Sequence, residues 1–145
     1  MHHAVNKNEV CARFSSSIGH HRLEQLDALA RGACALHFDT GMNRLGLSPG
    51  MLAGQREALQ KLQPVLVMSH LACADEPDQA MNAQQLAAFR AMTDDTEVPR
   101  CFANTGGILL GSDYHFDLAR PGIGLYGGTM LEGGIGTIAS AHIFA

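Results

Sequence analysis

Short apolar runs, each followed by polar residues and separated by segments of helical pattern, constrain the fold of this chain most. Residues 33–39, 65–68 and 101–103 form such runs, and residues 116–119 are a fourth candidate strand. Strands that alternate with helices are typical of a parallel sheet with crossover helices. The sequence therefore predicts an α/β fold with about four parallel strands.

Helices are predicted over residues 22–31, 48–62 and 82–92, between the apolar runs. The first places leucines on one face, as an amphipathic helix does. The second opens with a Ser-Pro pair, in which the hydroxyl can cap the helix and the proline fits the first turn. The third is expected to open with Asn82 and Gln85 in a capping arrangement.

Composition limits the class of protein. The chain has 145 residues, 46% of them hydrophobic, so it can bury a core as one domain. A formal net charge of -4 without a Lys/Arg-rich run argues against a nucleic-acid partner. No apolar stretch reaches the ~18–20 residues of a membrane span. The four cysteines form no CxxC pair, so we expect reduced thiols, a cytoplasmic protein and no metal site.

Polar residues follow each predicted strand. The four groups are residues 39–44, 69–70, 104–105 and 120–123. Because the carboxyl ends of parallel strands meet at one edge of a sheet, we expect these groups to share one mouth. Two arginines, a histidine, a hydroxyl and backbone amides suit an anionic ligand, particularly a phosphate.

Each of these residues also has an ordinary structural explanation. Arg44 and Arg120 can each be a surface ion-pair residue, and His70 can be a structural histidine. Asn104 before a helix-like run can serve only as an N-cap. Their joint placement after successive strands is what favours a site.

Five segments resemble the alanine racemase family, in the order in which they occur along the chain. They are "DTGMNRLGL" at 39–47, "MSHLACAD" at 68–75, "NAQQLAAF" at 82–89, "ANTGGIL" at 103–109 and "ARPGIGLYGG" at 119–128. The resemblance implies an isomerase that uses pyridoxal 5'-phosphate (PLP) to interconvert L-alanine and D-alanine for the bacterial cell wall.

Members of that family have an eight-stranded α/β barrel followed by a C-terminal β domain, and two subunits of a homodimer build each site. The resemblance therefore implies a partial (β/α)8 barrel of the TIM type, with residues 20–128 supplying its second half. Residues 1–19 are a weakly defined N-terminal segment. Residues 129–145 are expected to begin the linker to a missing β domain.

The resemblance also implies roles for three charged or titratable side chains. Arg120 matches the arginine that faces the pyridine nitrogen of PLP; because a guanidinium holds its protons, it would leave that nitrogen unprotonated. Arg44 matches the arginine near the cofactor's phenolic oxygen and the substrate carboxylate. His70 matches a histidine between Arg120 and the catalytic tyrosine. These three are the predicted catalytic residues.

The phosphate of PLP is expected to be held by residues after the last two strands. Thr105 matches the family's serine or threonine that donates to the phosphate. The backbone N–H groups of Gly122 and Ile123 would complete that cradle, with Asn104 in the same polar shell.

The chain departs from the family pattern in two respects. His37 stands where many members have a lysine that can be carbamylated; it can orient Arg44 by accepting a hydrogen bond, or be a strand histidine satisfied by its neighbours. Neither Lys7 nor Lys61 matches the Schiff-base lysine, and the catalytic tyrosine of the β domain is also missing. We therefore expect the chain alone not to racemise alanine at a useful rate.

Two alternatives to alanine racemase remain at this stage. One is a catalytically inactive barrel fragment with residual PLP or phosphate binding. The other is a related PLP-dependent racemase of a different amino acid, because substrate breadth is set partly by the missing domain.

Overall fold

The computed structural model describes residues 34–61 and 63–128. The predictions for the N-terminal segment, for the helix at 22–31 and for the linker at 129–145 lie outside the described residues.

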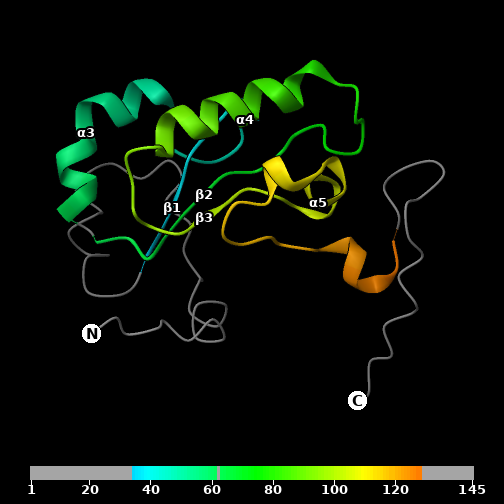
Figure 1. The fold of residues 1–145 in the computed structure, drawn as a ribbon. Coiled ribbons are helices and arrows are strands. Elements are labelled where there is room, and N and C mark those ends of the chain that lie inside the picture. The colour runs from blue at the N-terminus through cyan, green and yellow to red at the C-terminus, as the bar shows by residue number, and fades with distance from the viewer. Residues whose placement is uncertain (1–33, 62, 129–145) are drawn as a thin grey trace, which may run out of the picture.

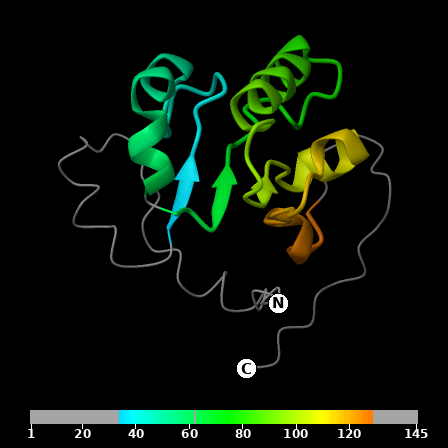
Figure 2. The same ribbon diagram turned by 60° about the vertical axis from the view of Figure 1, so that its left-hand side comes forward.

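Three short parallel strands form the described sheet, in the order β1-β2-β3. They are β1 (Ala35–His37), β2 (Leu66–Met68) and β3 (Arg100–Cys101). Both crossovers are helical, through α3 (Pro49–Lys61) and α4 (Ala80–Thr93). Figures 1 and 2 show α3 and α4 on the same side of the strands. The predicted parallel sheet with crossover helices is confirmed.

The fourth candidate strand does not form a regular strand and contributes only isolated bridges. Leu118 forms an isolated parallel bridge with Cys101. Phe116 has a φ of 51°, in the left-handed region, so the backbone before Leu118 is not extended. The side chain of Asp117 also accepts the N–H of Arg100 at 2.8 Å, which takes a donor from the ladder. The segment thus runs beside β3 through isolated bridges and backbone hydrogen bonds, and not as a regular strand.

Three short helical elements follow β3 and complete the described chain. They are α5 (Thr105–Leu110), η1 (Ser112–Tyr114) and η2 (Ile123–Tyr126). Gly106 packs α5 against the segment after β2, since a Cβ there would lie 2.5 Å from the carbonyl oxygen of Ala74. Only glycine permits this close approach.

The start of α3 agrees with its sequence signals. The hydroxyl of Ser48 accepts the N–H of Met51 at 3.4 Å, as an N-cap does. Glu57 and Lys61 form the expected i,i+4 ion pair at 3.0 Å, and both side chains are exposed. An exposed pair of this kind adds little stability.

The predicted capping arrangement of α4 is wrong. The helix begins at Ala80, and its N-cap residue Gln79 makes no capping hydrogen bond with its side chain. Asn82 and Gln85 are buried instead. The amide of Asn82 donates to the carbonyl oxygen of Glu76 at 2.8 Å, so it holds the preceding loop and not the helix end.

The core lies between the sheet and the helices and contains an aromatic cluster. The rings of Phe89 on α4 and Phe102 after β3 are fully buried and stack with centroids 4.8 Å apart. Phe116 meets Phe89 edge-on at 5.0 Å, and Tyr114 stacks on Phe102 at 6.2 Å. The segment after α5 is thereby joined to α4 through aromatic contacts.

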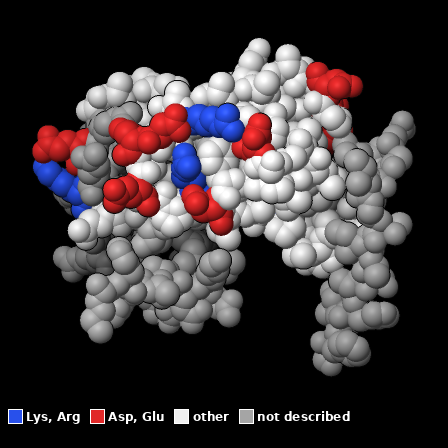
Figure 3. Space-filling model, in the orientation of Figure 1, with Lys and Arg blue, Asp and Glu red and all other residues white. Residues whose placement is uncertain are grey.

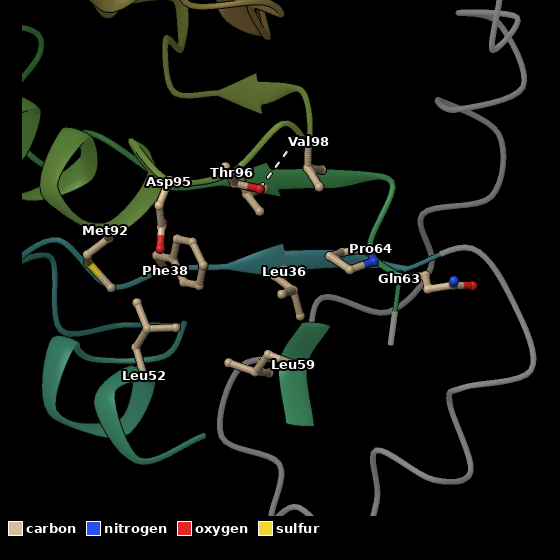
Figure 4. A pocket seen from close by; sticks show the side chains of 11 residues that line it. Leu36, Phe38, Leu52, Leu59, Gln63, Pro64, Met92, Asp95, Thr96 and Val98 are labelled. Atoms are coloured by element: carbon tan, nitrogen blue, oxygen red, sulfur yellow. Dashed lines mark hydrogen bonds between the residues drawn. The ribbon is translucent and has the colours of Figure 1, made fainter. Parts of the chain in front are cut away.

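An apolar cavity of about 250 Å³ lies between α3, α4 and the sheet (Figure 4). Leu36 and Phe38 of the β1 segment face Leu52 and Leu59 of α3 across it. Asp95 is the charged side chain in its lining. An acidic, apolar space on the helix-covered side does not suit a phosphate, so this cavity is not the predicted site.

The cysteines, the helix lengths and the surface charges of the described residues bear on what the composition suggests. Cys34, Cys73 and Cys101 carry thiols. No helix within the described ranges is long and apolar enough to cross a membrane. The same residues contain no group of three or more His, Cys, Asp or Glu side chains placed to hold a metal ion. On the face in Figure 3, acidic and basic side chains are interspersed.

Candidate functional site

Backbone hydrogen bonds place the predicted strand ends next to one another. The N–H of Ser69, directly after β2, donates to the carbonyl oxygen of Cys101 at 3.1 Å. The N–H of Arg120 donates to the carbonyl oxygen of Ala103 at 2.8 Å. Polar groups that are far apart in the sequence therefore meet at the carboxyl ends of the strands, as a parallel sheet requires.

Arg120 is the centre of this group. Its Nε donates to Cys101 Sγ at 3.0 Å, and its Nη1 meets His70 Nδ1 at 3.4 Å. Its Nη2 donates to the carbonyl oxygens of Ser69 and Phe102, the latter at 3.4 Å. Each acceptor comes from the end of β2 or β3, so the two strands together fix the guanidinium.

The donors of Arg120 are not all used by the protein. A guanidinium carries five N–H donors. Four acceptors surround it within the described residues, and they can take four of those protons. One Nη1 proton remains for a ligand that accepts a hydrogen bond.

The contact with Arg120 also defines the protonation of His70. Arginine can only donate, so His70 Nδ1 accepts and the ring proton resides on Nε2. Burial lowers the pKa of His70 to about 4, with further lowering by the charges of Arg120 and Arg44 and by His37. His70 is therefore neutral at physiological pH, and no acceptor for its Nε2–H is found among the described residues.

Arg44 and His37 lie within electrostatic reach of the same group. Arg44 lowers the pKa of both His70 and His37, which places it on the side of the two histidines, although its side chain is exposed. Burial is the main cause of the lowered pKa of His37, followed by the charges of Arg120 and Arg44.

His37 is not fully satisfied by its neighbours. It is 7% exposed, and its Nδ1 is buried without a hydrogen-bond partner among the described residues. The interpretation of His37 as a strand histidine satisfied on all sides is therefore wrong for Nδ1. The ring that carries this nitrogen lies in the electrostatic field of Arg120 and Arg44.

Thr105 and the segment after Arg120 meet on the other side of the site. The Thr105 hydroxyl accepts the N–H of Gly124 at 3.1 Å and keeps its own proton to donate. A Cβ added at Gly122 would find no atom within 4 Å, so space lies beside this backbone. Within the described residues, no group accepts the N–H of Gly122 or Ile123.

Asn104 acts first as a helix cap. Its side-chain oxygen accepts the N–H of Gly107 at 2.9 Å at the start of α5. This confirms the N-cap interpretation, and the described contacts of Asn104 include no other member of the site.

Sequence reasoning missed two residues that hold the site. Cys101 was assigned only to a strand, yet its sulfur accepts from Arg120. Gln85 was assigned to a helix cap, yet it is fully buried beside the loop that carries His70. The one available signal for Gln85 was its place on the apolar side of α4, four residues before Phe89.

The free energy of unfolding is expected to fall as the pH is lowered from about 6.5 to about 4. In the unfolded chain His70 gains a proton near its ordinary pKa of 6.5, whereas the folded protein resists protonation until about 4. The unfolded state therefore binds more protons in this window, and acid favours it. His37 acts in the same direction.

Urea unfolding of the 145-residue chain at several pH values measures this dependence. His70→Gln is the comparison, because it removes the titrating group. An equal pH slope in this variant and in the parent would contradict the assignment to His70.

The described chain is a parallel α/β sheet whose strand ends bring Arg120, His70 and Ser69 together, and this is the arrangement of part of an α/β barrel. A sequence model described as "Alanine racemase, N-terminal domain" matches residues 8–130. The chain belongs to this family, and the resemblance seen in its motifs is confirmed.

Named relatives agree with this family. An alanine racemase of Cereibacter sphaeroides is 61% identical over 97 residues, which cover 67% of this chain and 28% of the relative. The alanine racemase of Bartonella henselae, solved with covalently bound pyridoxal phosphate, superposes with a TM-score of 0.65 at 36% identity, over 73% of this chain and 32% of that one. The alanine racemase of Streptomyces coelicolor superposes with a TM-score of 0.70 at 33% identity, over 86% of this chain and 37% of that one.

These comparisons also show how much of a relative the chain covers and which fold it has. It spans less than a third of the length of the Cereibacter relative. The matched family domain and the parallel strands confirm a partial α/β barrel of the TIM type.

Proposed function

We propose that this chain forms part of an alanine racemase, a PLP-dependent isomerase that interconverts L-alanine and D-alanine. The observation that carries the proposal is Arg120, which is held by four protein acceptors and keeps one Nη1 proton for a ligand. Family membership supports the reaction, and the neighbour from Bartonella contains pyridoxal phosphate.

The residues present fit PLP. Its phosphate needs donors and open space, and Thr105 offers a hydroxyl proton while Gly122 and Ile123 offer backbone N–H groups beside an open volume. The ring nitrogen of PLP needs a donor that keeps its proton, which a guanidinium does. When bound, PLP supplies an electron sink that acidifies the α-proton of an amino acid.

The chain's own residues would then bind and orient the cofactor and the substrate. Arg120 would donate to the ring nitrogen and leave it unprotonated, which weakens the sink and limits the chemistry to exchange of the α-proton. His70 would accept from Arg120 through Nδ1 and donate from Nε2 toward the catalytic tyrosine. Arg44 would bind the substrate carboxylate, and Asn104 would complete the polar shell.

The residues that the structure describes do not place a lysine at the proposed site. Lys61 is on the exposed surface of α3 in an ion pair with Glu57, so the described residues provide no lysine at the site. We propose that the activity belongs to a homodimeric enzyme that also contains the catalytic lysine and tyrosine. A cytoplasmic supply of D-alanine for peptidoglycan is the role we propose for it.

A chimera tests this function. The Cereibacter alanine racemase would carry this chain's residues in place of the 97 that match, and is called the chimera below. With PLP and L-alanine it is expected to form D-alanine and to restore growth of a D-alanine auxotroph. A chimera that folds and binds PLP but racemises no alanine, or prefers a different amino acid, would overturn the proposal.

A further inference from the structure

Gln85 connects α4 to two strand-end loops. It is 0% exposed, in the middle of the helix. Its Nε2 donates to Thr40 Oγ1 and to the carbonyl oxygen of His70, both at 3.0 Å. Its Oε1 accepts the N–H of Ala72 at 2.8 Å. Both amide protons and the amide oxygen are thus used, on groups that follow β1 and β2.

The contacts of Gln85 continue to Arg120 along two routes. Thr40, which accepts from Gln85, also shares a hydrogen bond of 2.9 Å with the Ser69 hydroxyl. The carbonyl oxygen of Ser69 accepts from Arg120. The second route is shorter, since Gln85 holds the backbone of His70 and the ring of His70 accepts from Arg120 at 3.4 Å.

We propose that Gln85 is a positioning residue of the active site, which fixes the loop after β2 so that Ser69 and His70 hold Arg120 in place. The proposal rests on the proposed function for its effect on catalysis. Gln85 touches none of the predicted cofactor-binding groups directly, so its effect passes through His70 and Ser69.

The chemistry of a primary amide is what this place requires. The carbonyl oxygen of His70 accepts from Gln85 Nε2 at 3.0 Å, and the N–H of Ala72 donates to Gln85 Oε1 at 2.8 Å, so a single primary amide serves both groups. Because the Gln85 side chain is fully buried, its amide group would be left without partners if these hydrogen bonds were lost. Methionine has a similar length and volume to glutamine but offers neither a donor nor a strong acceptor.

The first test measures the pKa of His70 by NMR in the 145-residue chain. Gln85→Met is expected to raise this pKa from about 4 toward 6.5, because a released loop lets the ring leave its buried place beside Arg120, Arg44 and His37. Gln84→Met is the matched control, because Gln84 is the exposed neighbour on the same helix. The control is expected to leave the pKa unchanged.

A purely structural role gives a different result. It would lower the melting temperature of Gln85→Met while the pKa of His70 in the folded protein stayed at about 4, and that result would overturn the proposal. If Gln85→Met does not fold, Gln85→Asn takes its place. The shorter amide carries no charge and cannot span both loops, so an unchanged pKa in this variant would overturn the proposal equally.

The second test uses the chimera. Gln85→Met is expected to lower kcat about tenfold or more, with little change in KM for alanine, because misplacement of Arg120 affects the reacting geometry more than substrate binding. Equal kcat in Gln85→Met and Gln84→Met would argue against the proposal. If the chimera with Gln85 intact is inactive, the proposed function fails, and the NMR measurement still decides the role of Gln85.

Discussion

Arg120→Ala is expected to reduce alanine racemisation by the chimera by about a hundredfold to a thousandfold, the loss typical when one fixed electrostatic donor is removed. The substitution removes the guanidinium that Cys101, His70, Ser69 and Phe102 hold in place. A neighbouring ammonium or water cannot restore it, because the acceptors are arranged around a planar fork. Initial rates of D-alanine formation measure the effect.

Two further variants test whether the effect depends on the shape of the Arg120 guanidinium and on its place in the fold. Arg120→Lys keeps the charge but loses the fork, and we expect it to stay well below the parent rate. Arg90→Ala is the control, since Arg90 lies on α4 in a loose, exposed pair with Asp113 at 3.9 Å. Full activity in Arg120→Lys would show that only net charge matters, and the assigned hydrogen-bonding role would then be wrong.

Phe89→Ala is expected to lower the free energy of unfolding by about 3–5 kcal/mol, the usual cost of deleting a buried phenyl ring. Phe89 is 0% exposed and contacts two other aromatic rings, Phe102 by stacking and Phe116 edge-on. The cavity left behind would remove the aromatic contacts that α4 makes with the segment after β3. Chemical denaturation of the 145-residue chain measures the loss.

Leu125→Ala is the control for this stability experiment. Leu125 is 56% exposed on η2, so its truncation is expected to change the free energy of unfolding by no more than about 0.5 kcal/mol. Similar losses in Phe89→Ala and Leu125→Ala would mean that the aromatic cluster is not the core of the described fold.

The strands and crossover helices could be predicted because their signals are local. The apolar runs before His37 and Ser69 are continuous, and the Ser-Pro pair marks the start of α3 in a way that does not depend on distant contacts. The strand ends then followed from topology alone, since parallel strands bring their carboxyl ends together. This is how His70 and Arg120 could be assigned to one group.

The errors arose where a tertiary contact overrides a local pattern. Asn82 and Gln85 have the spacing of a capping pair, but burial of both amides against neighbouring loops decides their conformation. Phe116 fits a strand by composition, but its ring packs edge-on against Phe89 and its φ is 51°. Neither contact can be recognised from residues adjacent in sequence.

The acceptors around Arg120 are the Cys101 sulfur, a ring nitrogen and two peptide carbonyls, and none of them is a carboxylate. In the described part of the chain, no carboxylate lies within ion-pair distance of its guanidinium. The half-buried guanidinium is therefore held without a carboxylate partner among these residues, and its positive field and that of Arg44 both act on His70. Capture of a dianionic ligand at this site should be fastest in dilute buffer and should slow as salt screens the attraction, with inorganic phosphate and sulfate acting as competitors.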